Sequence, residues 1–357
     1  MTDAQTAQTP DELIAAELIT EQRGRLGVIT LNRPKAINAL TFEMVKGIRA
    51  QLLEWKEDDS VQAVLFRGAG DRGLCAGGDI VSIYHSIKAG DVAAGEEFFA
   101  TEYSMNNLIG EYPKPVVAFQ DGIVLGGGVG VSGHASHRVA TERTRWGMPE
   151  TGIGFVPDVG GTWLISRLPS EFGLHVGMTG EHITGADAVA LGLSTHHVSS
   201  ETLDEIAAAL ETEAPDTVLE RFATEPGESA LWEQRPWIEE CYAQDTPAKI
   251  IEALRARDEE AAHKAADRLS ALSPTAISVT LAAVRRARRA KDLATVLKTE
   301  YRTTAAHLRG HDFAEGIRAL LVDKDKNPQW QPATLDEVTP ELVESHFAEP
   351  ESGDLTL

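Results

Sequence analysis

The chain has 357 residues, 42% of them hydrophobic, and a formal net charge of −22. This length predicts a large hydrophobic core and about two domains. So acidic a surface argues against nucleic acid or an anionic membrane as a partner. If the ligand is itself an anion, local cationic groups or backbone N–H donors must bind it.

The two cysteines, Cys75 and Cys241, lie far apart in the sequence and predict no disulfide framework. The first 20 residues lack a basic segment followed by an apolar run, and they lack the arginines of a transit peptide. No apolar stretch reaches the ~18 residues that a membrane span needs. We therefore predict a soluble, cytoplasmic protein.

The N-terminal third alternates strand and helix signals. Residues 1–12 are predicted to be disordered, and Leu13–Pro34 has the alternation of a β-hairpin that turns near Gly24. Asn38–Asp58 carries apolar residues at helical spacing. Val61–Gly70 is typical of a buried strand that enters a glycine loop.

The same pattern repeats further along. A strand from Pro115 leads to the glycine run Gly126–Gly128, and His137–Glu142 is a further short strand. The alternation predicts an α/β core over residues 13–200. Residues 201–330 are predicted to be amphipathic helices, and residues 331–357 an irregular tail.

Two glycine loops, Gly73–Ile80 and Asp121–Gly130, each follow a strand and precede a helix. Such turns point free backbone N–H groups out of a helix N-terminus, and glycine allows a ligand to approach the backbone. Two loops together could donate two N–H groups to one oxyanion. The alternative is that the glycines only permit tight packing between strand and helix.

Glu150 and Asp158 stand in Pro149–Gly161, which is otherwise apolar or rich in glycine and proline. Because an unpaired buried carboxylate is costly, these acids either cap local structure or take part in chemistry. Glu150 could be a general base for water, a nucleophile, or a loop carboxylate held by N–H groups. Asp158 could cap the helix that follows it.

Five segments occur in an order that resembles the crotonase (enoyl-CoA hydratase/isomerase) superfamily. They are "NRPKAINAL", "GLCAGGDI", "KPVVAFQDGIVLGGGVG", "ATERTRWGMPETGIGFVPDVGGTWLISRLP" and "TGADAVALGLSTHHV". The resemblance implies a spiral of ββα units with a helical C-terminal region, and acyl-CoA substrates. "EYSMNNLIG" and the C-terminal "HFAEPESGDLTL" are similar to the hydrolase branch, whose substrate is 3-hydroxyisobutyryl-CoA. That branch implies a thioester hydrolase of valine catabolism that needs no cofactor, since coenzyme A is part of the substrate.

The resemblance also implies roles for individual residues. The N–H groups of Gly78 and Gly127 would form the oxyanion hole, and Glu150 would be catalytic. The superfamily's hydratases carry another glutamate at the position of Gly130, which argues against hydration here because water addition needs a base and a proton donor. Asp158 stands where hydratases commonly have glycine, and the resemblance implies a catalytic role for it: it would accept a hydrogen bond from the substrate's 3-hydroxyl and could assist proton transfer. With Glu102 it would bind the substrate's hydroxyacyl end. For Glu102 the alternative is a solvated helix residue.

The CoA contacts implied by the resemblance are Ala36, Leu40, Ala76, Gly77, Gly78, Asp79, Lys324 and Lys326. Asp79 is alternatively a local helix cap. The basic run Arg285–Lys291 is either a solvated helix face or a contact for a CoA phosphate. Cys75 is expected to be a small packed residue, and the paired histidines do not predict a metal site.

Two other functions remain open at this point. One is an enoyl-CoA hydratase or isomerase that works with a single glutamate. The other is a non-catalytic acyl-CoA-binding protein. The resemblance also makes a homo-oligomer possible.

Overall fold

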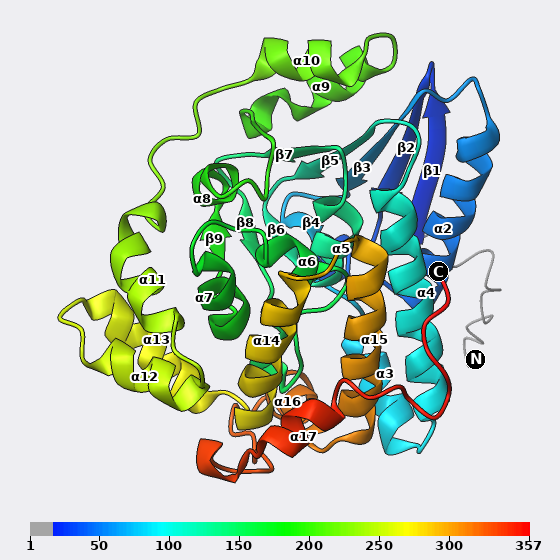
Figure 1. Cartoon of the computed structure of the whole chain (residues 1–357). Helices are drawn as coiled ribbons and strands as arrows, with labels where there is room; N and C mark the ends of the chain where they lie inside the picture. The colour runs from blue at the N-terminus through cyan, green and yellow to red at the C-terminus, as the bar shows by residue number, and fades with distance from the viewer. Residues whose placement is uncertain (1–16) are drawn as a thin grey trace, which may run out of the picture.

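The computed structural model describes residues 17–357 and shows a spiral whose successive turns each place one strand in each of two sheets (Figure 1). In the larger sheet β3, β5, β7 and β10 run parallel, and in the smaller one β4, β6 and β8 do the same. This arrangement confirms the predicted spiral of ββα units. The larger sheet consists of β1 (Leu18–Arg23), β2 (Leu26–Leu31), β3 (Ala63–Gly68), β5 (Val116–Gln120), β7 (His137–Ala140) and β10 (His196–His197), and the smaller of β4 (Gly73–Cys75), β6 (Ile123–Leu125), β8 (Arg145–Gly147) and β9 (Ile183–Thr184).

The predicted hairpin is β1–β2, which turns at Gly24 with a φ of 58°. The predicted helix after it is α2 (Phe42–Glu57), where the Thr41 hydroxyl accepts a hydrogen bond from the N–H of Met44 at 3.2 Å. The expected disorder of residues 1–12 lies outside the described residues.

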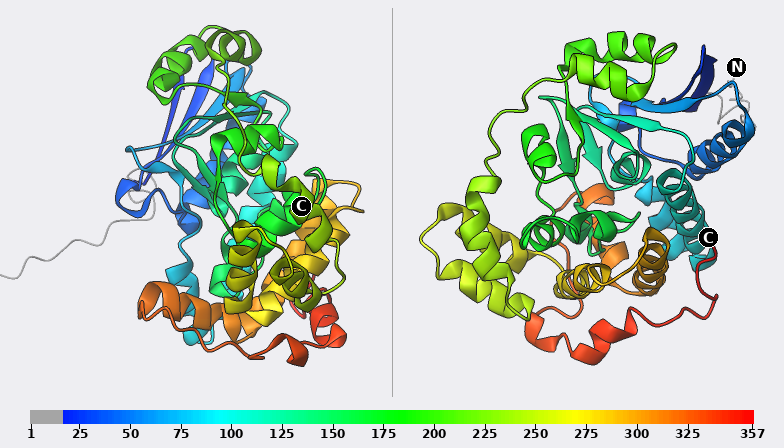
Figure 2. Two further views of the ribbon diagram at one scale, coloured as in Figure 1. Left: turned by 90° about the vertical axis from the view of Figure 1, so that its left-hand side faces the viewer. Right: turned by 45° about the horizontal axis from the view of Figure 1, so that its top comes forward.

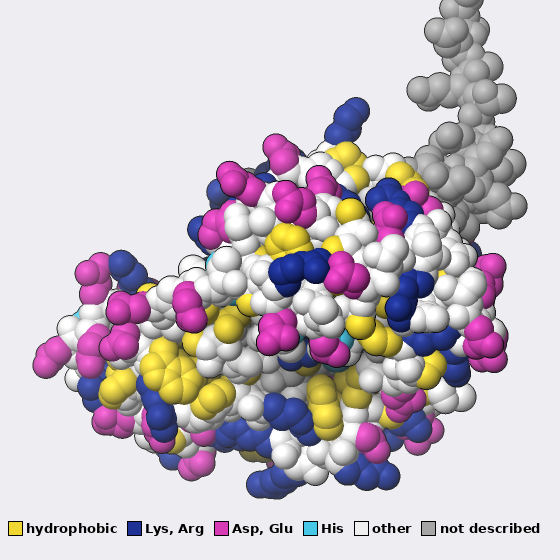
Figure 3. All heavy atoms as spheres, turned by 90° about the horizontal axis from the view of Figure 1, so that it is seen from above, with side chains coloured by type: hydrophobic (Ala, Val, Ile, Leu, Met, Phe, Trp, Pro, Cys, Tyr) yellow, Lys and Arg dark blue, Asp and Glu magenta, His cyan; other side chains and the backbone are white. Residues whose placement is uncertain are grey.

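Both faces of the larger sheet are covered. In β3, Ala63 and Leu65 pack beneath α9 (Leu203–Leu210) and α10 (Pro215–Phe222), whereas Val64 and Phe66 face the main core. Burial on both faces explains why this strand is continuously apolar rather than alternating. On the face seen in Figure 3, basic side chains are scattered among acidic ones.

Helices dominate after residue 200, as expected: α9 and α10 lie over one face of the larger sheet, and the later helices lie beside and below the spiral in the view of Figure 1. Figure 2 shows α11–α13 as a lobe joined to α10 by an extended segment, while α15 (Leu293–Arg309) packs along α4 (Val92–Gly110). Residues 331–357 are only partly irregular because they include α17. The remaining helices are α3 (Ile80–Lys88), α5 (Gly127–Gly133), α6 (Gly161–Ile165), α7 (Phe172–Thr179), α8 (Gly185–Ala190), α11 (Arg235–Tyr242), α12 (Pro247–Arg255), α13 (Glu260–Ala271), α14 (Pro274–Ala287), α16 (Asp312–Ile317) and α17 (Pro340–Ser345).

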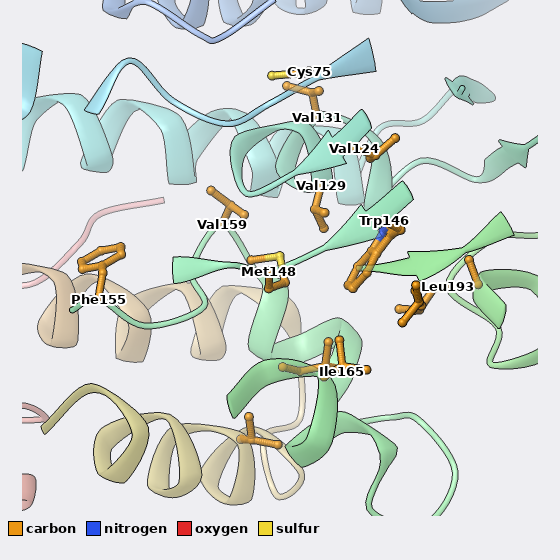
Figure 4. Close-up of a cluster of buried hydrophobic side chains, with 14 of the residues drawn as sticks. Cys75, Val124, Val129, Val131, Trp146, Met148, Phe155, Val159, Ile165 and Leu193 are labelled. Carbon is orange, nitrogen blue, oxygen red and sulfur yellow. The ribbon is translucent and has the colours of Figure 1, made fainter. Parts of the chain in front are cut away.

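The second glycine loop rests on the first. A Cβ on Gly128 would lie 2.4 Å from the carbonyl oxygen of Cys75, a backbone atom at the end of β4. Beneath the loop, Val129 and Val131 of α5 belong to the same apolar cluster as Trp146 and Val159 (Figure 4). The close approach of the two loops therefore depends on glycine at position 128.

We expect Gly128→Ala to lower the free energy of unfolding by about 1–3 kcal/mol, because the methyl group forces the two loops apart in a packed core. Urea unfolding followed by circular dichroism measures this change. Gly152→Ala is the control, since a Cβ there has no neighbour within 4 Å. Equal stability of the two variants would contradict the close contact.

Candidate active site

A cavity of about 290 Å³ lies where the two glycine loops meet α4 and the segment that follows β8. Seven residues singled out from the sequence line it: Gly78, Gly127, Glu102, Glu150 and Asp158, together with the predicted CoA contacts Ala76 and Gly77. Its other lining residues are Ile80, Phe98, Phe99, Leu125, Gly126, Pro149, Ile153, Phe155, Val159, Leu320 and Leu321.

The two predicted backbone donors are neighbours. A Cβ on Gly127 would lie 3.2 Å from the nitrogen of Gly78. Neither N–H has a hydrogen-bond partner within residues 17–357. Leu40 is fully buried and braces the first loop, because its N–H donates to Gly77 and its carbonyl accepts from Asp79. The pair of N–H groups is thus free to bind one ligand oxygen.

Three carboxyl groups line the cavity, and their side chains are almost completely buried. Exposed fractions are 2% for Glu102, 7% for Glu150 and 4% for Asp158, and none of them has an ion pair among the described residues. One oxygen of Glu102 (Oε1) and one of Glu150 (Oε2) also lack any hydrogen-bond partner there. Buried polar atoms left without a partner are typical of functional sites.

Burial perturbs all three acids. It raises the pKa of Glu150 and of Glu102 well above the usual value, and the nearby charge of Asp158 adds to both shifts. Burial raises the pKa of Asp158 to about 7, although a hydrogen bond from Tyr103 acts in the opposite direction. All three carboxyl groups are therefore protonated more readily than exposed acids, and Asp158 titrates near neutral pH, where general acids and bases work best.

Glycine also determines where the carboxyl group of Glu150 can lie. Glu150 begins a 3₁₀ turn, Glu150–Ile153, just after β8. A Cβ on Gly126 would lie 2.8 Å from Oε1 of Glu150, and the φ of Gly126 is 50°. The carboxyl group can approach the second loop only because this residue has no side chain.

Asp158 is not a helix cap, so that alternative is wrong. The helix after it, α6, begins beyond Gly160 without a side-chain cap of its own. Instead, Glu300 of α15 accepts hydrogen bonds from the N–H groups of Gly160 at 2.6 Å and Thr162 at 2.9 Å. Because Glu300 satisfies these N–H groups, the Asp158 side chain is left to face the cavity. The alternative of a solvated Glu102 is also wrong, since that side chain is buried.

Gly130, the position of the missing hydratase glutamate, has no space for a side chain. A Cβ there would lie 2.8 Å from Nδ2 of Asn106 and 2.9 Å from Cβ of Val159. Asn106 is fully buried on α4, one turn after Glu102. The volume that a glutamate would need is thus filled by side chains of neighbouring elements.

The remaining predicted CoA contacts lie at the outside of the site. Ala36 is exposed at the end of the turn Pro34–Ala36. Lys324 and Lys326 are exposed just after a π-helix, Arg318–Val322, whose Leu320 and Leu321 reach the cavity. The C-terminal region thereby contributes to the mouth of the cavity.

Asp79 occupies the position before α3, but its side chain makes no cap hydrogen bond. It forms an ion pair with Arg33 instead, with Nη2 and Oδ2 3.2 Å apart. The expectation of a local cap is therefore wrong for its side chain, and the N–H groups of Ile80 and Ser82 at the start of α3 donate to the carbonyls of Gly78 and Asp79 instead.

The basic run Arg285–Lys291 does not line the cavity. Arg285 donates to the carbonyl of Gln244 at 2.6 Å, Arg286 pairs with Glu344, and Arg288 donates to Glu171 at 3.0 Å. These contacts tie the end of α14 to neighbouring segments.

Cys75 is fully buried, and burial raises its pKa to about 12, so it is a packed thiol and not a nucleophile. Among residues 17–357, no three His, Cys, Asp or Glu side chains are grouped so that they could hold a metal ion.

The family model for enoyl-CoA hydratase/isomerase matches residues 26–347. The chain therefore belongs to this family, the crotonase superfamily. Two curated relatives are described as mitochondrial 3-hydroxyisobutyryl-CoA hydrolases: one from Danio rerio is 40% identical over 96% of this chain and 92% of its own length. The other, from Homo sapiens, is 41% identical over 96% and 91%.

Two solved structures share the fold over nearly the whole chain. One, described as a carnitinyl-CoA dehydratase from Mycobacterium thermoresistibile, has 51% identity and a TM-score of 0.92, and covers 95% of this chain and 98% of its own. The other, an enoyl-CoA hydratase from Rhodobacter sphaeroides, has 37% identity and a TM-score of 0.90, with 96% and 100% covered. Within residues 17–357, no helix is both long and apolar enough to cross a bilayer.

The buried carboxyl groups should cost stability at high pH. The pKa of Asp158 is about 7 in the folded chain against an ordinary value of 3.8, so the native state binds the extra proton between these values and loses stability as the pH rises through them. We expect Asp158→Asn to stabilise the fold by about 1–3 kcal/mol at pH 8 and by less at pH 5.

Urea unfolding at both pH values measures this difference, with Glu220→Gln on the exposed face of α10 as the control. A gain that is the same at pH 5 and pH 8 would refute the assignment.

Proposed function

We propose that this protein is an acyl-CoA thioester hydrolase that converts 3-hydroxyisobutyryl-CoA to the free acid and CoA, as a step of valine catabolism. The observation that carries the proposal is the cavity that sets Glu150 and Asp158 opposite two free N–H groups, while Gly130 has no room for a second hydratase glutamate. The curated relatives described as 3-hydroxyisobutyryl-CoA hydrolases support the choice of substrate.

In this mechanism the thioester carbonyl oxygen lies between the N–H groups of Gly78 and Gly127. Water adds to the carbonyl carbon, and negative charge develops on that oxygen. Fixed donors stabilise this charge, each by ~3 kcal/mol. The C–S bond then breaks, and the thiolate leaves with little need for a strong acid because a thiol has a pKa of about 8.5.

Glu150 drives the attack by one of two routes. As a general base it takes a proton from water and returns it to the leaving sulfur. As a nucleophile its carboxylate attacks the thioester carbon in place of water and expels the CoA thiolate, and water then hydrolyses the mixed anhydride to the free acid and the Glu150 carboxylate. Label from H₂¹⁸O in the Glu150 carboxyl group would identify the anhydride route, because it enters only when water attacks the Glu150 carbonyl carbon of the anhydride.

Asp158 and Glu102 bind the hydroxyacyl end of the substrate. The free Oε1 of Glu102 and the carboxylate of Asp158 are acceptors in an otherwise mainly apolar cavity. A hydroxyl group on the acyl chain donates its single proton to one of these two acceptors, whereas an unsubstituted chain leaves both of them unpaired, which is costly.

The CoA moiety leaves the cavity past the first glycine loop, where Ala36, Ala76, Gly77, Gly78 and Asp79 contact it, while the predicted contact Leu40 is fully buried and supports this loop instead. Lys324 and Lys326 supply positive charge for its phosphates against the net charge of −22. The reaction uses no further cofactor.

A cytoplasmic location stays a proposal. It rests on the two free cysteines, which fit a reducing compartment, whereas the curated relatives are described as mitochondrial.

The second candidate is hydration or dehydration of the acyl chain. The solved structure described as a carnitinyl-CoA dehydratase, at 51% identity, favours it. Elimination of water needs a base at one carbon and an acid at the hydroxyl, as addition does. Because the packing at Gly130 leaves no space for the second glutamate of the hydratases, Asp158 or Glu102 would have to act as the second acid or base in this reaction.

We expect rapid release of free thiol from 3-hydroxyisobutyryl-CoA by the purified protein, and a loss of at least about 1,000-fold in kcat for Glu150→Gln, because the variant removes the base or nucleophile. Thiol release is followed with a chromogenic disulfide, and crotonyl-CoA hydration is followed in parallel. Hydration of crotonyl-CoA without thiol release would overturn the hydrolase and favour the second candidate.

We expect wild type to prefer 3-hydroxyisobutyryl-CoA over isobutyryl-CoA in kcat/KM, and Glu102→Leu to reduce that preference about 10-fold or more, because the hydroxyl loses an acceptor. The ratio of the two rates with one protein preparation cancels errors in active concentration. An unchanged ratio would show that Glu102 does not contact the hydroxyl group.

A further inference from the structure

Tyr103 makes the one side-chain hydrogen bond to Asp158 that the structure shows among the described residues. It lies on α4, is fully buried, and donates from its hydroxyl to Oδ2 of Asp158 at 2.7 Å. The same hydroxyl lies 2.7 Å from Oγ1 of Thr304 on α15. Because a tyrosine has a single hydroxyl proton, Thr304 must be the donor in that second bond.

The resulting chain runs from Thr304 through Tyr103 to Asp158. Each donor polarises the next, so the last bond to the carboxylate is strengthened. Since Oδ2 is occupied by Tyr103, Oδ1 is the oxygen that remains available to a ligand in the cavity.

The other titratable groups that face Asp158 are all acids. They are Glu102 on α4, Glu150 on the turn after β8 and Glu300 on α15, whose pKa values the charge of Asp158 raises in turn. Within the part of the chain that the structure describes, no Lys, Arg or His forms an ion pair with Asp158. The Tyr103 hydroxyl therefore acts against burial to favour the charged form of Asp158.

Helix α15 also fixes the loop that carries Asp158. Glu300 stands one turn before Thr304 and accepts the N–H groups of Gly160 and Thr162, two and four residues beyond Asp158. One face of α15 thus holds both the backbone of this loop and, through Tyr103, its side chain.

We propose that Tyr103 is a positioning residue that keeps Asp158 ionised and aimed at the cavity as the acceptor for the substrate's hydroxyl group, with Thr304 orienting Tyr103. The proposal rests on the proposed function, because it explains how an acid in a cluster of acids stays an acceptor. Without the tyrosine hydroxyl, Asp158 takes up a proton at higher pH and becomes a donor instead.

The test compares Tyr103→Phe with Tyr112→Phe. Tyr112 is a matched control, since its hydroxyl donates to the carbonyl of Leu52, also at 2.7 Å, and it does not line the cavity. The measurement is kcat/KM against pH, from pH 5 to pH 9, for 3-hydroxyisobutyryl-CoA and for isobutyryl-CoA. Circular dichroism and melting confirm that both variants are folded.

For Tyr103→Phe we expect the acidic limb of the profile to move to higher pH by about one unit or more, because the charged form of Asp158 loses a hydrogen bond. The loss at pH 7 is about 10-fold or more with the hydroxylated substrate and small with isobutyryl-CoA. Thr304→Val shifts the limb in the same direction by less. An unshifted limb, or an equal loss with both substrates, overturns the proposal.

Failure of the proposed function gives a different result. If wild type hydrates crotonyl-CoA and releases no thiol, the proposed hydrolase function is overturned. The role of Tyr103 can then still be tested, by measuring the hydration rate against pH for Tyr103→Phe and Tyr112→Phe. Calorimetric binding of the thioether analogue of 3-hydroxyisobutyryl-CoA over the same pH range makes the comparison without turnover. A Tyr103→Phe profile that matches Tyr112→Phe in these measurements overturns the role of Tyr103.

Discussion

The structure depends on the burial of four carboxyl groups, Glu102, Glu150, Asp158 and Glu300, without an ion pair to any of them within residues 17–357. Such burial is costly, and the fold offsets the cost unevenly. Glu300 accepts two backbone N–H groups and the Thr162 hydroxyl, so its role is structural. Asp158 receives one hydroxyl, while Glu150 and Glu102 each keep an oxygen without a partner. The carboxyl groups that line the cavity thus have fewer hydrogen-bond partners than Glu300, and a bound substrate can supply the missing ones.

Glycine gives these acids their positions by leaving space. Gly126 makes room for the carboxyl group of Glu150, and Gly128 lets the second loop rest on the carbonyl of Cys75. That contact brings the N–H groups of Gly78 and Gly127 together. Gly130 has the opposite consequence, because the space beside it is already filled by Asn106 and Val159. Gly126, just before α5, therefore leaves space for the carboxyl group of Glu150, whereas a glutamate at position 130 within α5 would have no space.

The C-terminal helices complete a site whose loops come from the spiral. α15 packs along α4 and braces the Asp158 loop, and the segment after α16 brings Leu320 and Leu321 to the cavity mouth. A spiral core that ended near residue 200 would present the glycine loops and Glu150, but Asp158 would lack its support. The helical region is therefore part of the active site rather than an appendage to it.

The sequence alone determined the features that depend on near neighbours along the chain. The alternation in β1–β2, the helical spacing of α2 and the two glycine loops each follow from local periodicity and from glycine's freedom at a turn, and the family's motifs marked Glu150, Asp158, Glu102, Gly78 and Gly127. Tyr103, a polar residue at an inward position of α4 beside Glu102, was a further sequence signal that could have predicted its place in the site.

Only the tertiary structure decided which partner each side chain finds. Asp79 takes Arg33 rather than the end of α3, and Glu300 caps α6 in place of Asp158. Glu300 lies 140 residues from Gly160, and in the sequence it is the single glutamate of an amphipathic helix, with no local pattern that marks it as a cap for α6. Periodicity shows which face of a helix is buried, but hydrogen bonds between distant segments depend on how those faces meet in space, and no local pattern encodes that meeting.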